Sequence, residues 1–122
     1  ANLESVDDII DRHKDNGNHY NEQLKDISGV TLLENKDDRE SAYWIYSMKV
    51  EKHNDFMKWM KECDIMVSRV HERNDNHTCV KDYKTVLPNL DKVIKEMICI
   101  PCGWWVTDEQ REYIVGCIKR GW

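Results

Sequence analysis

Residues Ala42 to Val50 read AYWIYSMKV, and this stretch determines which kind of fold the chain can form. It is rich in aromatic and branched side chains and contains no glycine or proline, which is typical of a β-strand. Successive side chains of a strand point to opposite faces of the sheet, so Trp44, Tyr46 and Met48 would share one face. We therefore expect residues 42–50 to form the main strand of a sheet.

A helical pattern precedes this strand. Ser5 is suited to cap a helix, because the acidic residues Asp7 and Asp8 would lie in its first turn. Ser28-Gly29 would end that helix. The apolar positions keep helical spacing except at Asn16-Gly17-Asn18, where polar residues and a glycine weaken the pattern. We expect a long first helix that frays or bends at this weak middle.

Three further helices are predicted after the strand. Asn54 or Asp55 would cap the first of them, which ends near Cys63. The next begins at Pro88 and should turn four apolar side chains inward: Leu90, Val93, Ile94 and Met97. The last has the clearest signal, because Thr107 and Gln110 form a capping-box pattern just before an apolar stripe.

Short apolar segments at 30–33, 65–70 and 98–100 are predicted to add strands to the sheet. The resulting fold class is α+β, with a small mixed or antiparallel sheet packed against about four helices. A length of 122 residues is typical of one domain, so we expect residues 1–122 to form a single domain.

The composition excludes several classes of protein. The net charge is −5, from 18 basic and 23 acidic side chains, which argues against a dedicated nucleic-acid binder. No apolar run reaches the roughly 20 residues that a membrane helix needs. The five cysteines are an odd number and no secretion signal precedes them, which favours free thiols in a reducing compartment. We therefore expect a cytoplasmic protein that binds neither membrane nor nucleic acid.

The segment 70–77, VHERNDNH, concentrates polar groups directly after a predicted strand. It begins like the zinc-protease motif H-E-x-x-H, but the fourth residue after His71 is Asp75, and His77 lies six residues on, so the motif is not met. A looser zinc site could combine four residues: His71, His77, Cys99 and Cys102. The remaining interpretations are a substrate-facing loop and a solvated turn.

The order of these segments resembles one protein family. The chain is similar to the C-terminal small domain of the DegT/DnrJ/EryC1/StrS sugar aminotransferases, which are pyridoxal-phosphate enzymes of fold type I. The similarity is carried by SAYWIYSMKV (41–50), by IMVSRVH (65–71) and by the closing stretch at 87–118, LPNLDKVIKEMICIPCGWWVTDEQREYIVGCI. His71 and His77 match the spacing of the family's V-H-Y-x-x-x-x-H pattern, with Glu72 where tyrosine is common.

The resemblance implies a role for the polar loop. In the family this loop reaches toward the active site and helps to form the nucleotide-sugar pocket. His71 and His77 would then face the substrate, with Arg73 and Asn74 as neighbours. The implied reaction transfers an amino group from glutamate to a keto-sugar nucleotide through pyridoxal phosphate.

The resemblance also implies what lies outside this chain. In the family, the lysine that binds the cofactor belongs to a larger N-terminal domain, so we expect this chain to be inactive alone and to need that domain in cis or in trans. The alternative is a non-catalytic binding or assembly module. Such a module would expose an apolar patch, for which Trp104, Trp105 and Trp122 are candidates, and could form a homodimer.

Overall fold

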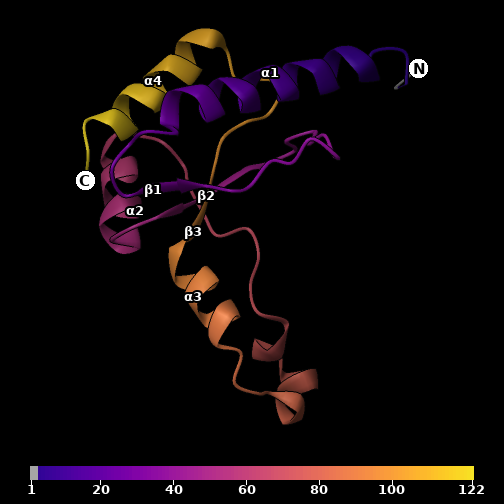
Figure 1. The fold of residues 1–122 in the computed structure, drawn as a ribbon, viewed down its shortest axis with the longest axis vertical. Helices are drawn as coiled ribbons and strands as arrows, with labels where there is room; N and C mark the ends of the chain where they lie inside the picture. Colours follow the sequence, from indigo (N-terminus) through magenta and orange to yellow (C-terminus); the bar gives the residue numbers. More distant parts are fainter. Residues whose placement is uncertain (1–2) are drawn as a thin grey trace.

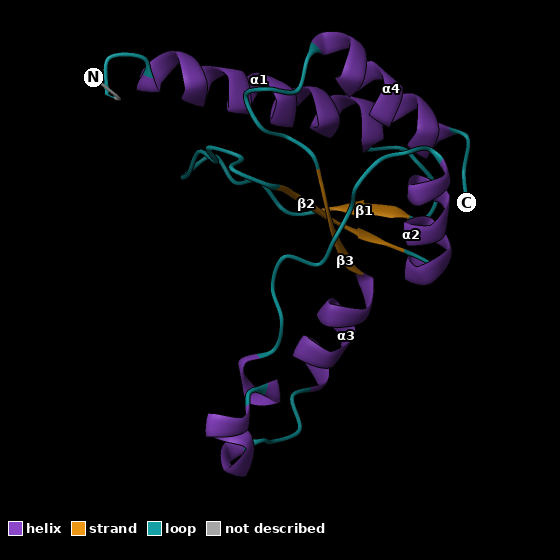
Figure 2. Cartoon of the chain, turned by 180° about the vertical axis from the view of Figure 1, so that it is seen from behind, coloured by secondary structure: helices purple, strands orange, loops and turns teal. Residues whose placement is uncertain are grey.

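The computed structural model describes residues 3–122 and arranges helices on one side of a small sheet (Figure 1). The described α-helices are α1 (Val6–Leu24), α2 (His53–Glu62), α3 (Pro88–Glu96) and α4 (Asp108–Lys119). The described strands are β1 (Val30–Leu32), β2 (Tyr46–Val50) and β3 (Met97–Ile100), and two short 3-10 helices, η1 (Asn74–Asn76) and η2 (Thr78–Tyr83), lie between α2 and α3. Helices α1 and α4 lie side by side above the sheet, and α2 covers one end of it (Figures 1 and 2).

The sheet is antiparallel with the strand order β1-β2-β3, which confirms the predicted α+β class. Its central strand alternates as expected, because Tyr46, Met48 and Val50 are buried while the side chains between them are only half-buried. These three side chains face the helices and form the centre of the core together with Phe56 of α2 and Ile118 of α4. Burial of one strand face fixes the pairing register, since a shift by one residue would turn this apolar face outward.

The central strand is shorter than predicted. It begins at Tyr46 rather than Ala42, because Tyr43 has a φ of 45°, which lies in the left-handed region and interrupts extended backbone. The predicted strand at 65–70 is wrong. Only Ser68 pairs there, in a single bridge with Cys99, and the chain then leaves the sheet. Apolar composition alone could not distinguish this crossing segment from a strand.

The segment between Ile65 and β3, residues 66–96, passes the sheet at Ser68 and then extends away from the rest of the chain, and we call it the arm (Figures 1 and 2). None of its residues is buried. Leu90, Val93 and Ile94 of α3 are half-buried while Lys92 and Lys95 are exposed, so the predicted apolar face is present but does not reach the core, and Met97 lies in β3. Helical spacing identified an apolar stripe, but this part of the chain offers no core for it to enter.

Helix α2 begins differently from the prediction. Neither Asn54 nor Asp55 acts as its cap; the cap position is Lys52, in the left-handed region with a φ of 48° and without a capping side-chain hydrogen bond. Asp55 lies instead in the first turn, where its negative charge is favourable against the helix dipole. The left-handed turn at Lys52 directs the chain from β2 directly into the helix.

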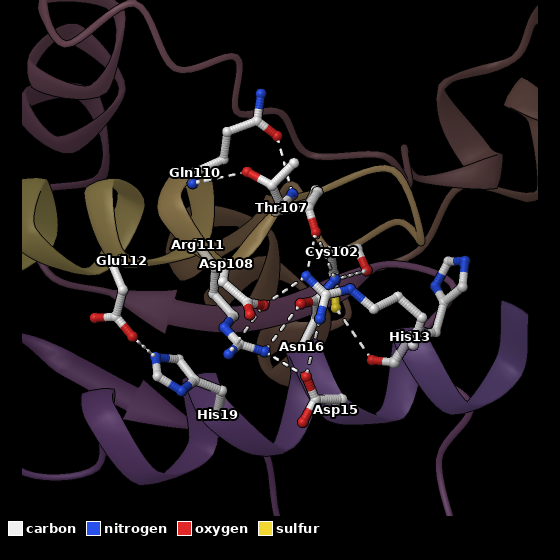
Figure 3. Close-up of polar contacts among 12 residues, drawn as sticks. His13, Asp15, Asn16, His19, Cys102, Thr107, Asp108, Gln110, Arg111 and Glu112 are labelled. Atoms are coloured by element: carbon white, nitrogen blue, oxygen red, sulfur yellow. Dashed lines mark hydrogen bonds and ion pairs between the residues drawn. The ribbon is translucent and has the colours of Figure 1, made fainter. Parts of the chain in front are cut away.

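The middle of α1 is not weak. The helix is continuous from Val6 to Leu24, and Asn16 and Gly17 are both buried within it. The Asn16 side-chain amide donates to the carbonyl oxygens of Cys102 (3.5 Å), Gly103 (3.1 Å) and Val106 (3.5 Å), which belong to the loop before α4 (Figure 3). The predicted bend is wrong because these polar residues are satisfied by contacts distant in the sequence.

The capping box of α4 is confirmed. The Gln110 backbone N–H donates to Thr107 Oγ1 (3.2 Å), and the Thr107 backbone N–H donates to Gln110 Oε1 (3.0 Å) (Figure 3). The helix also begins with Asp108 and Glu109, whose charges suit its positive end. This local motif therefore formed where the sequence predicted it.

Replacing Thr107 with alanine should lower the free energy of unfolding by about 1 kcal/mol, because one N-terminal N–H of α4 loses its acceptor. Thr107→Ser keeps the hydroxyl and should remain close to the parent. Urea denaturation of the three proteins measures the difference. Equal loss of stability in the serine and alanine variants would show that the hydroxyl does not carry the effect.

Among residues 3–122, no helix combines the length and the apolar character needed to cross a bilayer.

Candidate functional site

A cleft of about 380 Å³ lies where the loop before β2 meets α1 and the start of the arm. Its floor is formed by side chains of Asn21, Tyr43 and Tyr46, and its rim by the loop that carries Arg39 and Glu40. The residues that line it are Asn21, Leu33, Glu34, Asn35, Arg39, Glu40, Ser41, Tyr43, Trp44, Ile45, Tyr46, Ser47 and His71. Segments far apart in the sequence therefore contribute to one concave surface, which is the usual form of a small-molecule site.

One wall of the cleft is aromatic. The Trp44 ring and the His71 ring have centroids 6.3 Å apart with planes inclined at 62°, an edge-to-face arrangement. Trp44 is 66% exposed, which is unusual for so large an apolar side chain. This wall offers a surface on which a ring of a bound molecule can pack.

The floor of the cleft is a hydrogen-bonded chain. Tyr46 Oη donates to Asn21 Oδ1 (2.8 Å), and Asn21 Nδ2 donates to Tyr43 Oη (2.8 Å). The Tyr43 and Tyr46 rings also stack, with centroids 5.9 Å apart. Burial raises the pKa of Tyr46 far above its usual value, because its charged form would be poorly solvated there.

Arg73, which we predicted to contact substrate, is engaged within the arm. Its guanidinium donates through Nε to Asp75 Oδ1 (2.7 Å) and also pairs with Asp91 at the start of α3. The hydrogen bond from Arg73 holds the pKa of the Asp75 carboxyl below its usual value. In this chain the arginine thus ties the η1 segment to α3.

The structure places the four predicted site residues at different points of the arm. His71 lines the cleft, whereas Asn74 begins η1 and His77 lies exposed immediately after it. That they contact substrate stays a prediction. Trp44 and Asn21 line the cleft but were missed, because Trp44 was assigned to the strand and Asn21 to the middle of a helix. The sequence carries no signal for the exposure of Trp44, because that exposure depends on the left-handed backbone at Tyr43.

The looser zinc site is not assembled. Within the described residues, no three side chains of histidine, cysteine, aspartate or glutamate lie close enough to share a metal ion. Cys99 Sγ lies 3.3 Å from Ser47 Oγ in the sheet, and Cys102 Sγ contacts the carbonyl oxygen of His13. Both cysteines of the predicted zinc site are thus buried and contact protein atoms.

The residues present do not fit covalent attachment of pyridoxal phosphate. A lysine that forms a Schiff base must be desolvated so that it loses its proton. Throughout residues 3–122 every lysine is exposed or half-buried. Lys14, near the cleft rim, pairs with Glu40 (2.9 Å), and this hydrogen bond raises the pKa of Lys14 instead of lowering it.

Acid should loosen the arm. The pKa of Asp75 is lowered in the folded state, so its pairing stabilises the arm above its ordinary value of 3.8 and is lost as the pH falls through the lower folded value. Hydrogen-exchange protection factors of residues 73–91 should fall between neutral pH and about pH 3. Asp75→Asn should already show the low protection at neutral pH.

Asp38→Asn is the matched control, because Arg39 also lowers the pKa of Asp38 but this pair lies outside the arm. Protection of residues 73–91 should be the same in this variant as in the parent. If Asp75→Asn leaves protection unchanged, the ion pairs do not hold the arm.

Comparison with known proteins gives consistent matches. The model of the DegT/DnrJ/EryC1/StrS aminotransferase family matches residues 1–119. The sugar aminotransferase CalS13 from Micromonospora echinospora is 43% identical, with a TM-score of 0.95, over 99% of this chain and 33% of CalS13. AtS13 from Actinomadura melliaura is 39% identical, with a TM-score of 0.96, over 99% of this chain and 32% of AtS13.

The curated relative is the erythromycin biosynthesis sensory transduction protein EryC1 of Saccharopolyspora erythraea. It is 21% identical over 124 residues, which cover 98% of this chain and 34% of EryC1. The chain therefore spans about a third of the length of each of these relatives.

Proposed function

Because the chain belongs to the DegT/DnrJ/EryC1/StrS aminotransferase family, we propose that it is the C-terminal small domain of a nucleotide-sugar aminotransferase. The family depends on pyridoxal phosphate, which supplies the electron sink for amino transfer when bound. One observation carries the proposal: nearly the whole chain superimposes on a third of a sugar aminotransferase at 43% identity. The natural substrates proposed are a keto-sugar nucleotide and glutamate as amino donor.

In this proposal the chain contributes substrate contacts and does not hold the cofactor. His71 lines the cleft, and in this proposal the arm, which bears Arg73, Asn74 and His77, would reach toward the part of the enzyme that binds the cofactor. The absence of a buried lysine among residues 3–122 supports a cofactor site supplied by another domain, in cis or in trans. The chain alone is then not catalytically competent, and its five free cysteines suit a reducing, cytoplasmic setting.

The test uses a polypeptide that joins this chain to the cofactor-binding domain. His71→Ala and His77→Ala should each lower kcat/KM for the nucleotide sugar by about tenfold or more, since each removes a polar substrate contact. The visible absorbance of the bound cofactor should be unchanged. A double variant with the parent's kcat/KM would remove both histidines from the proposed site.

Inactivity of the isolated chain is tested separately. Mixed with pyridoxal phosphate and glutamate, the chain should produce no absorbance change beyond that of the free cofactor with exposed amines. Addition of the separately produced cofactor-binding domain should restore amino transfer. Activity of the 122-residue chain alone would overturn this part of the proposal.

A second candidate function is an assembly module, which one surface favours. A groove of about 440 Å³ on the α4 side is lined by apolar side chains that include Met66, Trp105 and Tyr113, and Trp105 is 63% exposed. Trp122 does not belong to this surface, because it packs on Phe56 and donates to the Glu51 carbonyl oxygen (2.8 Å). Sedimentation of the pure chain tests self-association, and a monomer at high concentration would argue against a homodimer through this groove.

A further inference from the structure

Tyr43 adopts a backbone conformation that large side chains avoid. Its φ of 45° lies in the left-handed region, where glycine and asparagine are the usual residues. Such conformations persist only when the surroundings hold them, and they gather at functional sites. Contacts from the surrounding residues must therefore hold the backbone of Tyr43 in this conformation.

Four contacts hold Tyr43, three from α1 and one from its own loop. His13 Nδ1 donates to its carbonyl oxygen (2.9 Å), its backbone N–H donates to Ser41 Oγ (3.2 Å), and Asn21 Nδ2 donates to its hydroxyl (2.8 Å). The ring lies directly over Gly17, where an added Cβ would be only 2.3 Å from Tyr43 Cγ. The absence of a side chain at position 17 is thus what lets the ring lie against α1.

The turn at Tyr43 changes where the next residue points. In an unbroken strand Trp44 would share the face of Tyr46, two residues on, and Tyr46 is only 2% exposed. Trp44 is instead 66% exposed and meets His71 edge-to-face on one wall of the cleft. The left-handed residue is therefore the point at which the chain leaves the core and presents a large aromatic ring to the cleft.

We propose that Tyr43, locked over Gly17, is a positioning residue that presents Trp44 against His71, and that Trp44 is a substrate-contacting wall of the cleft. The charges of the rim indicate what the wall contacts. Glu40 is paired with Lys14 (2.9 Å) and the Arg39 guanidinium with Asp38 (2.7 Å), so the residues that line the cleft offer no unpaired arginine or lysine to a diphosphate. The wall suits an uncharged ring of the substrate. The contact with substrate rests on the proposed function, whereas the positioning of Trp44 does not.

The positioning is tested in this chain by NMR of the His71 ring protons, assigned with His71→Gln. Their ring-current shift should be lost in Trp44→Leu, retained in Tyr43→Phe, and lost in Tyr43→Val, because a β-branched residue resists the left-handed region. A stability change alone would not move the shift in folded protein. The idea is overturned if folded Tyr43→Val keeps the parent's shift.

The contact between Trp44 and His71 can be tested even if Tyr43→Val does not fold. If Tyr43→Val is unfolded, the parent and Trp44→Leu remain to be compared, and identical His71 shifts in these two proteins would overturn the Trp44–His71 wall. The Trp44–His71 wall is supported if the ring-current shift of the His71 protons is lost in Trp44→Leu and retained in Tyr43→Phe.

The substrate contact is tested in the joined enzyme. Trp44→Leu should raise KM for the nucleotide sugar about tenfold, which corresponds to the loss of one good aromatic contact. Combining it with Tyr43→Val should add little, because Tyr43 acts through Trp44. If Trp44→Leu leaves KM unchanged while His71→Ala lowers kcat/KM, only the proposed contact between Trp44 and substrate is rejected. Unchanged kinetics in both variants would reject the proposed function of this site as well.

Discussion

Replacing Asn16 with leucine is expected to lower the free energy of unfolding by about 3 kcal/mol, because buried polar groups lose their partners. Asn16 is 0% exposed, and its amide donates to Gly103 O at 3.1 Å, with longer contacts to two neighbouring carbonyls. Its Oδ1 also accepts from Arg111 Nη1 (3.2 Å), which joins α4 to α1 (Figure 3). Leucine fills a similar volume but can satisfy none of these groups.

Asn18→Leu is the matched control, since Asn18 is exposed on the same helix two residues away. Its free energy of unfolding should stay within about 0.5 kcal/mol of the parent, as is usual for surface substitutions. Urea denaturation of both variants gives the comparison. Equal effects of the two substitutions would show that the buried amide network contributes no more than a surface residue.

The second large effect is expected at Gly17. A methyl group there would overlap the Tyr43 ring, with its Cβ 2.3 Å from Cγ and 2.4 Å from Cδ2, so the ring or the helix must move. Overpacking of this kind costs about 1–3 kcal/mol, which exceeds the helix-propensity gain of roughly 1 kcal/mol from glycine to alanine. Gly17→Ala should therefore be destabilised by up to about 2 kcal/mol, and its melting temperature should fall.

Gly116→Ala is the control, and its effect on the free energy of unfolding should have the opposite sign. Gly116 also lies inside a helix, α4, but an added Cβ meets nothing within 4 Å. This variant should be stabilised by about 0.5–1 kcal/mol through helix propensity alone. If both alanine variants are stabilised, the close approach of Tyr43 to α1 is not a packing constraint.

Elements with local signals could be predicted from the sequence, and elements decided by distant contacts could not. The box of Thr107 and Gln110 lies within four residues, so the start of α4 was predicted correctly. Asn16 and Gly17 carry a local signal for a weak helix, but their partners lie in Tyr43 and in the loop before α4. Pattern reasoning has no access to a partner 87 residues away.

In the candidate site, too, residues with a local sequence signal could be predicted and residues placed by the fold could not. His71 could be found because it follows an apolar segment and matches a spaced pattern of histidines. Trp44 could not, because its exposure depends on the left-handed turn at Tyr43, and nothing in AYWIYSMKV distinguishes that turn from extended strand. Arg73 was expected at the substrate, yet two carboxylates of the arm engage it in this chain.

The arm connects β2 and α2 to β3 while none of its residues, 66–96, enters the core. The entropy cost of closing a loop rises only with the logarithm of its length, so doubling this excursion would cost about 0.6 kcal/mol. Insertions and deletions between η1 and α3, beyond the bridge of Ser68 with Cys99, therefore carry little penalty for the sheet. The segment that carries His71 and His77 can therefore change in length and composition while the sheet and the helices packed on it keep their contacts.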